Sequence, residues 1–251
     1  MFDFKGDIVW VTGSASGIGN ATARLFAEHG ADVVVHGLNE REKSQALADE
    51  ITAMGRRAMV IDGDLTDSDG VDAMAAEIKE KMGGLSVLVN CAGGACRERF
   101  PAWETPNYIW DETIARNLSS MFYTSRACMP MLKATGKGRI INVSSMTERS
   151  GGIVGSIAYT TSKGGVNAFT RALAKEAAPD VRVNAASPGL VDSPFHSDDA
   201  RKMYPDLINR IPLGRIGDPI DLAGPILFLA SDHSGYMTGE VVESSGGMRV
   251  R

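Results

Sequence analysis

The stretch Ile8-Val-Trp-Val-Thr-Gly-Ser-Ala-Ser-Gly-Ile-Gly19 joins a short apolar run to the start of a helical pattern. Its glycines lack a Cβ atom, so the backbone can turn tightly and approach a pyrophosphate group. The charge of that group would lie at the positive end of a helix that begins near Gly17. Glycines in loops are usually only turns, but here a strand precedes them and a helix follows. We therefore predict a strand, a glycine turn and a helix that together bind a dinucleotide.

The residues after the second predicted strand, 32–35, bear on the choice of nucleotide. NAD sites usually place a carboxylate there to accept hydrogen bonds from the adenosine ribose. This chain has His36-Gly-Leu-Asn39 instead, and Gly37 would tolerate a 2′-phosphate. Arg41 is the nearest cation and Asn39 is a further donor, so NADP is weakly favoured over NAD. The alternative is that Arg41 is only a solvated residue in the first turn of a helix over residues 41–54.

Strands and helices alternate through the middle of the chain. The pattern predicts a strand at residues 57–61, a helix at 67–82 and a strand at 85–90. Such repetition is typical of a parallel sheet with helices on both faces, whose ligands bind beyond the carboxyl ends of the strands. Asp64 would receive the adenine amino group there. The small residues of Asn90-Cys-Ala-Gly93 would let a nicotinamide ribose lie against the backbone.

Asn117 lies within a long helix expected over residues 107–134. A buried Asn is costly unless its amide is hydrogen-bonded. The residue is therefore either a structural link to a neighbouring segment or a holder of a functional water molecule.

The segment Tyr159-Thr-Thr-Ser-Lys163 places a phenol and an ammonium four positions apart, on one face of a helix. A phenol titrates near ~10 in water, and a fixed cation nearby lowers that pKa. Lys163 is thus expected to make Tyr159 a proton donor or acceptor near neutral pH. The alternative is an ordinary surface pair on an amphipathic helix.

Composition narrows the class of protein. The 251 residues suit one α/β domain, 1–251, and the net charge of −5 argues against binding to nucleic acid or an anionic membrane. The chain has an odd number of cysteines, three, without metal-type spacing, and four scattered histidines, so we expect free thiols and no metal site. No apolar stretch approaches the ~20 residues of a membrane span, and the start lacks a signal-peptide pattern. A cytoplasmic location is expected.

Several motifs recur in a fixed order, and together they resemble the short-chain dehydrogenase/reductase family over essentially the whole chain. They are the glycine stretch that ends at Gly19, Asn90 to Gly93, Asn117, Ser145, Tyr159 with Lys163, Asn184-Ala-Ala-Ser-Pro-Gly189, Pro212-Leu-Gly-Arg-Ile-Gly-Asp-Pro219, Phe228-Leu-Ala-Ser-Asp232 and Thr238-Gly239.

The resemblance implies a Rossmann-type, doubly wound parallel sheet of seven strands between two helical layers, and an oxidoreductase that transfers hydride between NAD(P) and a carbonyl or secondary alcohol. Tyr159 would be the general acid/base, Ser145 would polarise the substrate oxygen, Lys163 would lower the Tyr159 pKa and bind ribose, and Asn117 would support a proton-relay water. A homotetramer is also implied.

The same resemblance, together with the strand-end positions, predicts the residues that bind the nucleotide. They are Gly13, Ser14, Ser16, Gly17, Ile18, Gly19, Asn39, Arg41, Asp64, Leu65, Asn90, Ala92, Gly93, Tyr159, Lys163, Pro188, Gly189, Val191 and Ser193. The chain departs from the family pattern in the fourteen positions from Ser145 to Tyr159, one more than usual, and in Ser193, where a Thr is common.

The substrate is less constrained by the sequence. Arg97, Arg99 and Arg149 fall in loops expected near the cleft, which favours an anionic substrate such as a sugar acid or an acyl-carrier thioester, unless they are solvated surface residues. Residues 188–212 form a segment that could close over the substrate, with His196 and Tyr204 in it. Two other classes remain: a catalytically silent nucleotide-sensing regulator, and an enzyme of dehydration or epimerisation.

Overall fold

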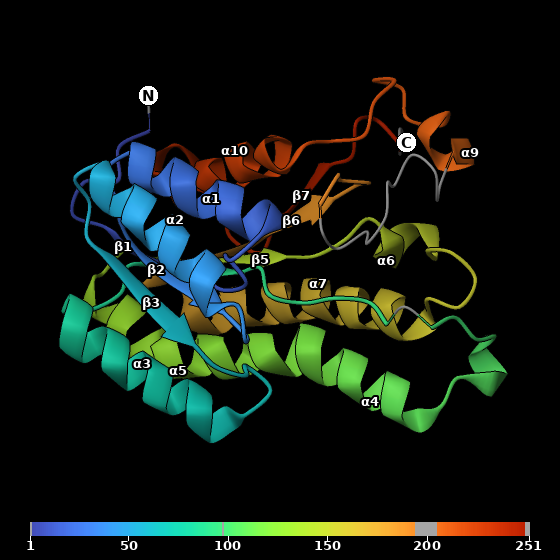
Figure 1. Ribbon diagram of the computed structural model, residues 1–251, viewed down its shortest axis with the longest axis horizontal. Helices are drawn as coiled ribbons and strands as arrows, with labels where there is room; N and C mark the ends of the chain where they lie inside the picture. Colours follow the sequence, from blue (N-terminus) through green and yellow to red (C-terminus); the bar gives the residue numbers. More distant parts are fainter. Residues whose placement is uncertain (1, 97, 194–204, 249–251) are drawn as a thin grey trace.

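The core of the protein is a parallel sheet of seven strands in the order β3-β2-β1-β4-β5-β6-β7 (Figure 1). The computed structural model describes residues 2–96, 98–193 and 205–248. The strands are β1 (Ile8–Val11), β2 (Asp32–Gly37), β3 (Ala58–Asp62), β4 (Val87–Asn90), β5 (Gly138–Val143), β6 (Val181–Pro188) and β7 (Val241–Ser244). The predicted sheet and its strand count are confirmed.

Helices cover both faces of the sheet. On one face lie α1 (Gly17–Glu28), α2 (Arg41–Ala53) and α10 (Pro219–Ala230), and on the other lie α3 (Ser68–Met82), α5 (Ser120–Ala134) and α7 (Ile157–Ala177) (Figure 1). The shorter elements are η1 (Ala102–Glu104), α4 (Asn107–Ile114), η2 (Ala115–Ser119), α6 (Thr147–Ser150), α9 (Pro205–Ile208) and η3 (Asp232–Ser234). The result is the predicted αβα sandwich.

Neighbouring side chains of the central strand enter different cores. Val9 and Val11 of β1 pack in the core beneath α1 and α10, whereas Trp10 packs in the core on the α3 and α5 side. All three side chains are fully buried. Because both faces of a parallel sheet are covered, its strands are continuous apolar runs rather than alternating ones, and this is the pattern that the sequence shows.

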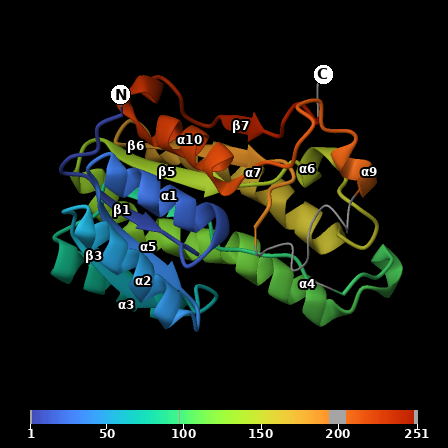
Figure 2. The same ribbon diagram turned by 45° about the horizontal axis from the view of Figure 1, so that its top comes forward.

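The strand order reverses between β1 and β4, because β2 and β3 continue on one side of β1 while β4 to β7 continue on the other. A crevice forms at the carboxyl ends of the strands at such a point. The loops after the strands gather at this edge, and α6 and α9 lie beyond it (Figure 2).

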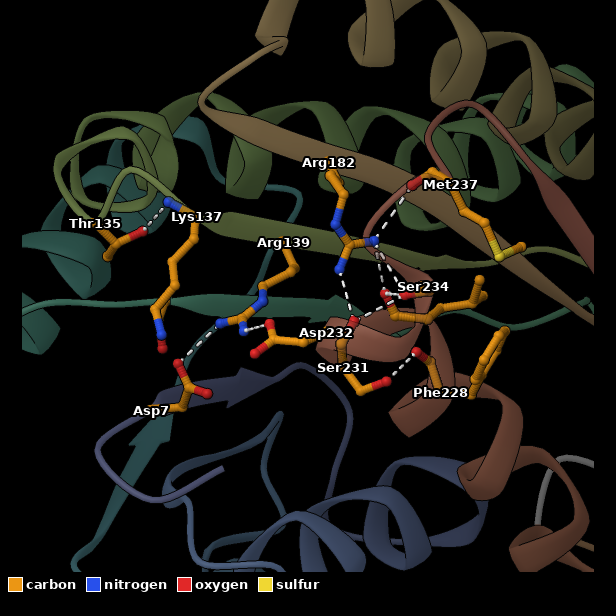
Figure 3. A network of polar contacts seen from close by, with 12 residues as sticks. Asp7, Thr135, Lys137, Arg139, Arg182, Phe228, Ser231, Asp232, Ser234 and Met237 are labelled. Atoms are coloured by element: carbon orange, nitrogen blue, oxygen red, sulfur yellow. Dashed lines mark hydrogen bonds and ion pairs between the residues drawn. The ribbon is translucent and has the colours of Figure 1, made fainter. Parts of the chain in front are cut away.

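A network of charged side chains lies at the opposite end of the sheet, where the strands begin (Figure 3). The buried guanidinium of Arg139, at the start of β5, donates to Asp7 Oδ1 at 2.9 Å and to Asp232 Oδ1 at 3.1 Å. Arg182 of β6 donates to the carbonyls of Leu229 and Ser231 at the end of α10. The network therefore fixes the carboxyl end of α10 against the starts of the central strands.

The predicted helix over residues 107–134 needs a correction, because a π-helical turn, η2, separates α4 from α5. The strand β5 ends at Val143, so the hydroxyl groups of Ser144 and Ser145 follow it. Within the described ranges, no helix is long and apolar enough to cross a membrane. His196, Tyr204 and Arg97 lie outside the described residues, as does the middle of the predicted closing segment, 194–204.

Candidate active site

A cavity of about 750 Å³ opens at the carboxyl ends of the strands. Most of the predicted site residues line it, although they come from distant parts of the chain. These lining residues are Gly13, Ser16, Gly17, Ile18, Gly19, Gly93, Ser145, Tyr159, Lys163, Pro188, Gly189, Val191 and Ser193.

The glycine turn is shaped for close backbone approach. Gly13 has a φ of +65°, and a Cβ there would lie 2.8 Å from the Cα of Ala92. A Cβ on Gly19 would collide with the carbonyl group of Gly13. α1 begins at Gly17, so its positive end adjoins the cavity. These features fit the pyrophosphate of a dinucleotide, which needs exposed backbone and no side chain in the way.

His36 holds this turn in place from the end of β2. Its Nδ1 accepts from the Gly13 N–H at 3.0 Å, and its Nε2 lies 3.0 Å from the carbonyl oxygen of Gly63. The two contacts require a neutral ring with the proton on Nε2. Burial lowers the His36 pKa from its ordinary value, which favours that neutral form.

Ser145 and Tyr159 form the reactive part of the cavity wall. Ser145 Oγ accepts from the Thr147 N–H at 3.3 Å and from the Thr147 hydroxyl at 3.0 Å. Its own proton is thereby left for Tyr159, whose pKa a hydrogen bond with Ser145 lowers. Ser144, the alternative hydroxyl, donates instead to the backbone carbonyl of Lys163 at 3.3 Å.

Lys163 lies beside Tyr159, but its charge does not dominate the pKa of the phenol. The Lys163 ammonium donates to the Val143 carbonyl at 2.8 Å and lies 5.7 Å from the centre of the Tyr159 ring. Burial raises the pKa of Tyr159 to about 12 and lowers the pKa of Lys163 to about 8. The expected lowering of the Tyr159 pKa by Lys163 is not seen in this structure, because burial of the phenol is the largest effect and raises its pKa.

Asn117 is fully buried in the π-helical turn and binds the loop after β4. Its Oδ1 accepts from the Gly94 N–H at 3.0 Å, and its Nδ2 donates to the carbonyls of Gly94 at 2.7 Å and Thr113 at 2.9 Å. The side chain thus fixes the loop that carries Gly93 on the cavity wall. Its predicted role in holding a water molecule stays a prediction.

The remaining predicted nucleotide contacts lie outside the cavity lining. Ser14, Leu65 and Asn90 are buried, and the amide of Asn90 donates to Asn142 and Ser125. Ala92 lies beneath Gly13. Asn39, Arg41 and Asp64 are exposed around the ends of β2 and β3, where an adenosine would extend.

Several cavity residues were missed by the sequence reasoning. Glu40, which lies between the end of β2 at Gly37 and the start of α2 at Arg41, could have been found from that position alone. Arg210 and Met248 follow α9 and β7 and had no local signal. Cys91 lines the cavity within the predicted Asn90 to Gly93 segment, and burial raises its pKa to about 11. Within the part of the chain that the structure describes, no group of acids, histidines and cysteines could hold a metal ion.

The chain is similar to known proteins over nearly its full length. Residues 13–249 match the family model described as enoyl-(acyl carrier protein) reductase. The subunit BbsD of (2S)-[(R)-hydroxy(phenyl)methyl]succinyl-CoA dehydrogenase from Thauera aromatica is 37% identical, over 96% of this chain and 95% of that protein. The 2-dehydro-3-deoxy-D-gluconate 5-dehydrogenase of Escherichia coli is 37% identical, over 100% of this chain and 98% of that protein.

A solved structure adds a likeness in three dimensions. The 7α-hydroxysteroid dehydrogenase complexed with NADH and 7-oxo glycochenodeoxycholic acid superimposes with a TM-score of 0.91 at 28% identity. The match covers 98% of this chain and 95% of that chain.

Proposed function

Because the chain belongs to the short-chain dehydrogenase/reductase family of oxidoreductases, we propose that it uses NAD(P) to interconvert a carbonyl compound and a secondary alcohol. The observation that carries the proposal is the meeting of Ser145, Tyr159 and Lys163 on the wall of the cavity that also contains the glycine turn. A nicotinamide bound there would supply or accept the hydride.

The side chains of this protein would handle the proton and the developing charge. Reduction of a carbonyl leaves an alkoxide, and hydrogen bonds from Ser145 and Tyr159 would stabilise that oxygen before Tyr159 gives it a proton. The contacts of Ser145 Oγ support this role, because the oxygen accepts both hydrogen bonds from Thr147 and so keeps its own proton to donate. Lys163, held by the Val143 carbonyl, would provide positive charge next to the ring.

We propose a weak preference for NADP(H) over NAD(H). The preference is weak because nearby cations would attract the 2′-phosphate and a nearby acid would repel it. Arg41 and Lys43 are exposed in the first turn of α2 and can meet a 2′-phosphate. Glu40 lines the cavity, forms an ion pair with Lys43 at 2.6 Å, and would repel that phosphate. Gly37 leaves no space for an acidic side chain, since a Cβ there would lie 2.7 Å from Ser44 Oγ.

Two substitutions test the nucleotide proposal in opposite directions. Arg41→Ala should weaken NADPH binding and leave NADH binding unchanged, whereas Glu40→Gln should strengthen NADPH binding several-fold. The dissociation constants of NADPH and NADH, measured by fluorescence titration, test both expectations. Equal effects on both nucleotides in either variant would show that these residues do not contact the 2′-position.

For the substrate, we propose a 3-oxoacyl thioester or a sugar or polyol. The names of the relatives support both classes, since one is a subunit of a [hydroxy(phenyl)methyl]succinyl-CoA dehydrogenase and the other is named as the dehydrogenase of a gluconate derivative.

We further propose that the chain forms a homotetramer in the cytoplasm. The exposed Phe122 of α5 lies 6.5 Å from Phe169 of α7, centre to centre, and leaves an aromatic surface on the outer helical layer. Three free thiols suit a reducing compartment. Light scattering should give four chain masses, and Phe122→Glu should lower that number.

The decisive experiment compares wild type with Tyr159→Phe. Both should bind the nucleotide with similar dissociation constants, and turnover of a carbonyl and alcohol panel should fall by about 100-fold or more in the variant. Failure of both nucleotides to bind at millimolar concentration would reject the glycine-turn site. Binding without any turnover in the wild type would favour a silent regulator.

A further inference from the structure

Two arginines line the cavity together with Tyr159, and they come from separate parts of the fold. Arg99 lies in the loop between β4 and α4, and Arg210 follows α9. Neither has an ion pair or a side-chain hydrogen bond to any residue in the described ranges. Both guanidinium groups are therefore available to a ligand.

The backbone at Arg99 is fixed relative to the reactive tyrosine. Gly155, four positions before Tyr159, has a φ of +80°, and a Cβ on it would lie 2.9 Å from Arg99 Cβ and 3.1 Å from the backbone nitrogen of Phe100. The loop thus rests directly on the turn that leads into α7. Arg99 is held beside the reactive group by this contact.

Arg210 is anchored on another side, at the end of the sheet. The next residue, Ile211, is buried, and a Cβ on Gly246 would lie 2.7 Å from the Ile211 side chain. The Leu213 N–H also donates to the Gly246 carbonyl at 3.1 Å. Met248, in the same turn as Gly246, lines the cavity.

The cavity lining that these arginines share contains few acids. Among the described residues that line the cavity, Glu40 is the only acidic one, and it lies after β2 on the glycine-turn side. Arg149, which the sequence also suggested, is different, because it pairs with Glu148 at 2.9 Å and does not line the cavity. Among the described residues that line the cavity, the cations are Arg99, Arg210 and Lys163.

We propose that Arg99 and Arg210 form an anion-binding subsite, so that the substrate carries a carboxylate or phosphate away from its reacting carbon. This inference rests on the proposed oxidoreductase function. Guanidinium groups bind both anions through paired N–H donors. The side chains of Ile153, Leu207 and Met248 line the same cavity and would contact the apolar part of such a substrate.

The test uses three pairs of ketones that differ in an anionic group: acetoacetate with ethyl acetoacetate, acetoacetyl-CoA with its N-acetylcysteamine thioester, and 5-keto-D-gluconate with D-fructose. The first and third pairs probe a carboxylate, and the second probes phosphates. For at least one pair, kcat/KM should favour the anion in the wild type. Arg99→Ala and Arg210→Ala should each lower kcat/KM for that anion by about tenfold and leave the neutral partner within about twofold.

Arg149→Ala is the matched control, because it removes an arginine that is already paired. It should leave kcat/KM unchanged for both ketones of each pair. Calorimetric binding of the anionic ketone to Tyr159→Phe separates this inference from the proposed function. If the wild type turns over no ketone, but the anionic ketone still binds and Arg99→Ala abolishes that binding, the subsite stands and the proposed reaction is wrong. Equal losses for anionic and neutral ketones, or no preference for an anion in any pair, would overturn the subsite.

Discussion

At the scale of single residues, His36 links three strand ends through one imidazole ring. Its contacts to Gly13 and Gly63 join the glycine turn after β1 to the end of β3. Replacement by Gln should cost about 1–3 kcal/mol of unfolding free energy, because the half-buried Gly13 N–H loses its imidazole acceptor. Nucleotide affinity should fall as well, since the turn is no longer fixed.

The same residue gives a pH dependence with a defined sign. Burial lowers the pKa of His36 in the folded protein below the unfolded value of 6.5. The unfolded chain therefore binds more protons below pH 6.5, and the stabilisation present above that pH is lost as the pH falls through the folded pKa. Urea unfolding from pH 8 to pH 5 should show a steeper loss for wild type than for His36→Gln. Parallel curves would mean that His36 is protonated equally in both states.

At the scale of elements, the turn between α6 and α7 positions the loop that carries Arg99. Gly155→Ala should reduce kcat/KM for a carbonyl substrate by about tenfold, because the new Cβ pushes that loop away from Tyr159. Nucleotide affinity should not change. Steady-state kinetics and fluorescence titration measure the two quantities.

Gly151 is the matched control for this substitution. It has a φ of +79°, close to that of Gly155, but no atom lies within 4 Å of its Cβ position. Both alanine variants should lose about 1–2 kcal/mol of stability from the left-handed backbone, whereas only Gly155→Ala should lose activity. Equal activity in the two variants would show that the contact with Arg99 is unimportant.

Sequence patterns predicted most elements but not their interruptions. The helix Pro219–Ala230 has a start that is recognisable in the sequence, because Asp218 caps it and Pro219 is its first residue. The π-helical turn at Ala115–Ser119 was missed, because no residue type in that stretch marks an extra residue in a helical turn. Asn117, within the turn, contacts Gly94 across the chain.

At the scale of the whole molecule, the site residues at the ends of strands could be predicted from the sequence. Those in loops could not, because their positions depend on how the loops pack. Gly13, Gly93 and Tyr159 follow or begin regular elements, so their meeting follows from a parallel sheet. Arg210 reaches the cavity only through the anchoring of Ile211 on Gly246. The Tyr159 pKa also escaped prediction, because desolvation depends on every segment around the phenol.

The charged network at the starts of the strands depends on tertiary structure in the same way, since Asp7 and Arg139 are 132 positions apart (Figure 3). Asp7→Ala should lower the unfolding free energy by about 3 kcal/mol or more, because it leaves the buried Arg139 guanidinium without its buried partner. Asp232→Ala is the control: its carboxylate binds the same guanidinium but is 89% exposed, so the loss should be about 1 kcal/mol or less.

Both variants should bind nucleotide as the wild type does, because the network and the cavity lie at opposite ends of the strands. Urea titration gives the unfolding free energies, and fluorescence titration gives the dissociation constants. Equal destabilisation by the two substitutions would mean that burial of the Asp7 carboxylate is irrelevant. A loss of nucleotide affinity in Asp7→Ala would instead reveal that the starts and the carboxyl ends of the strands are coupled through the sheet.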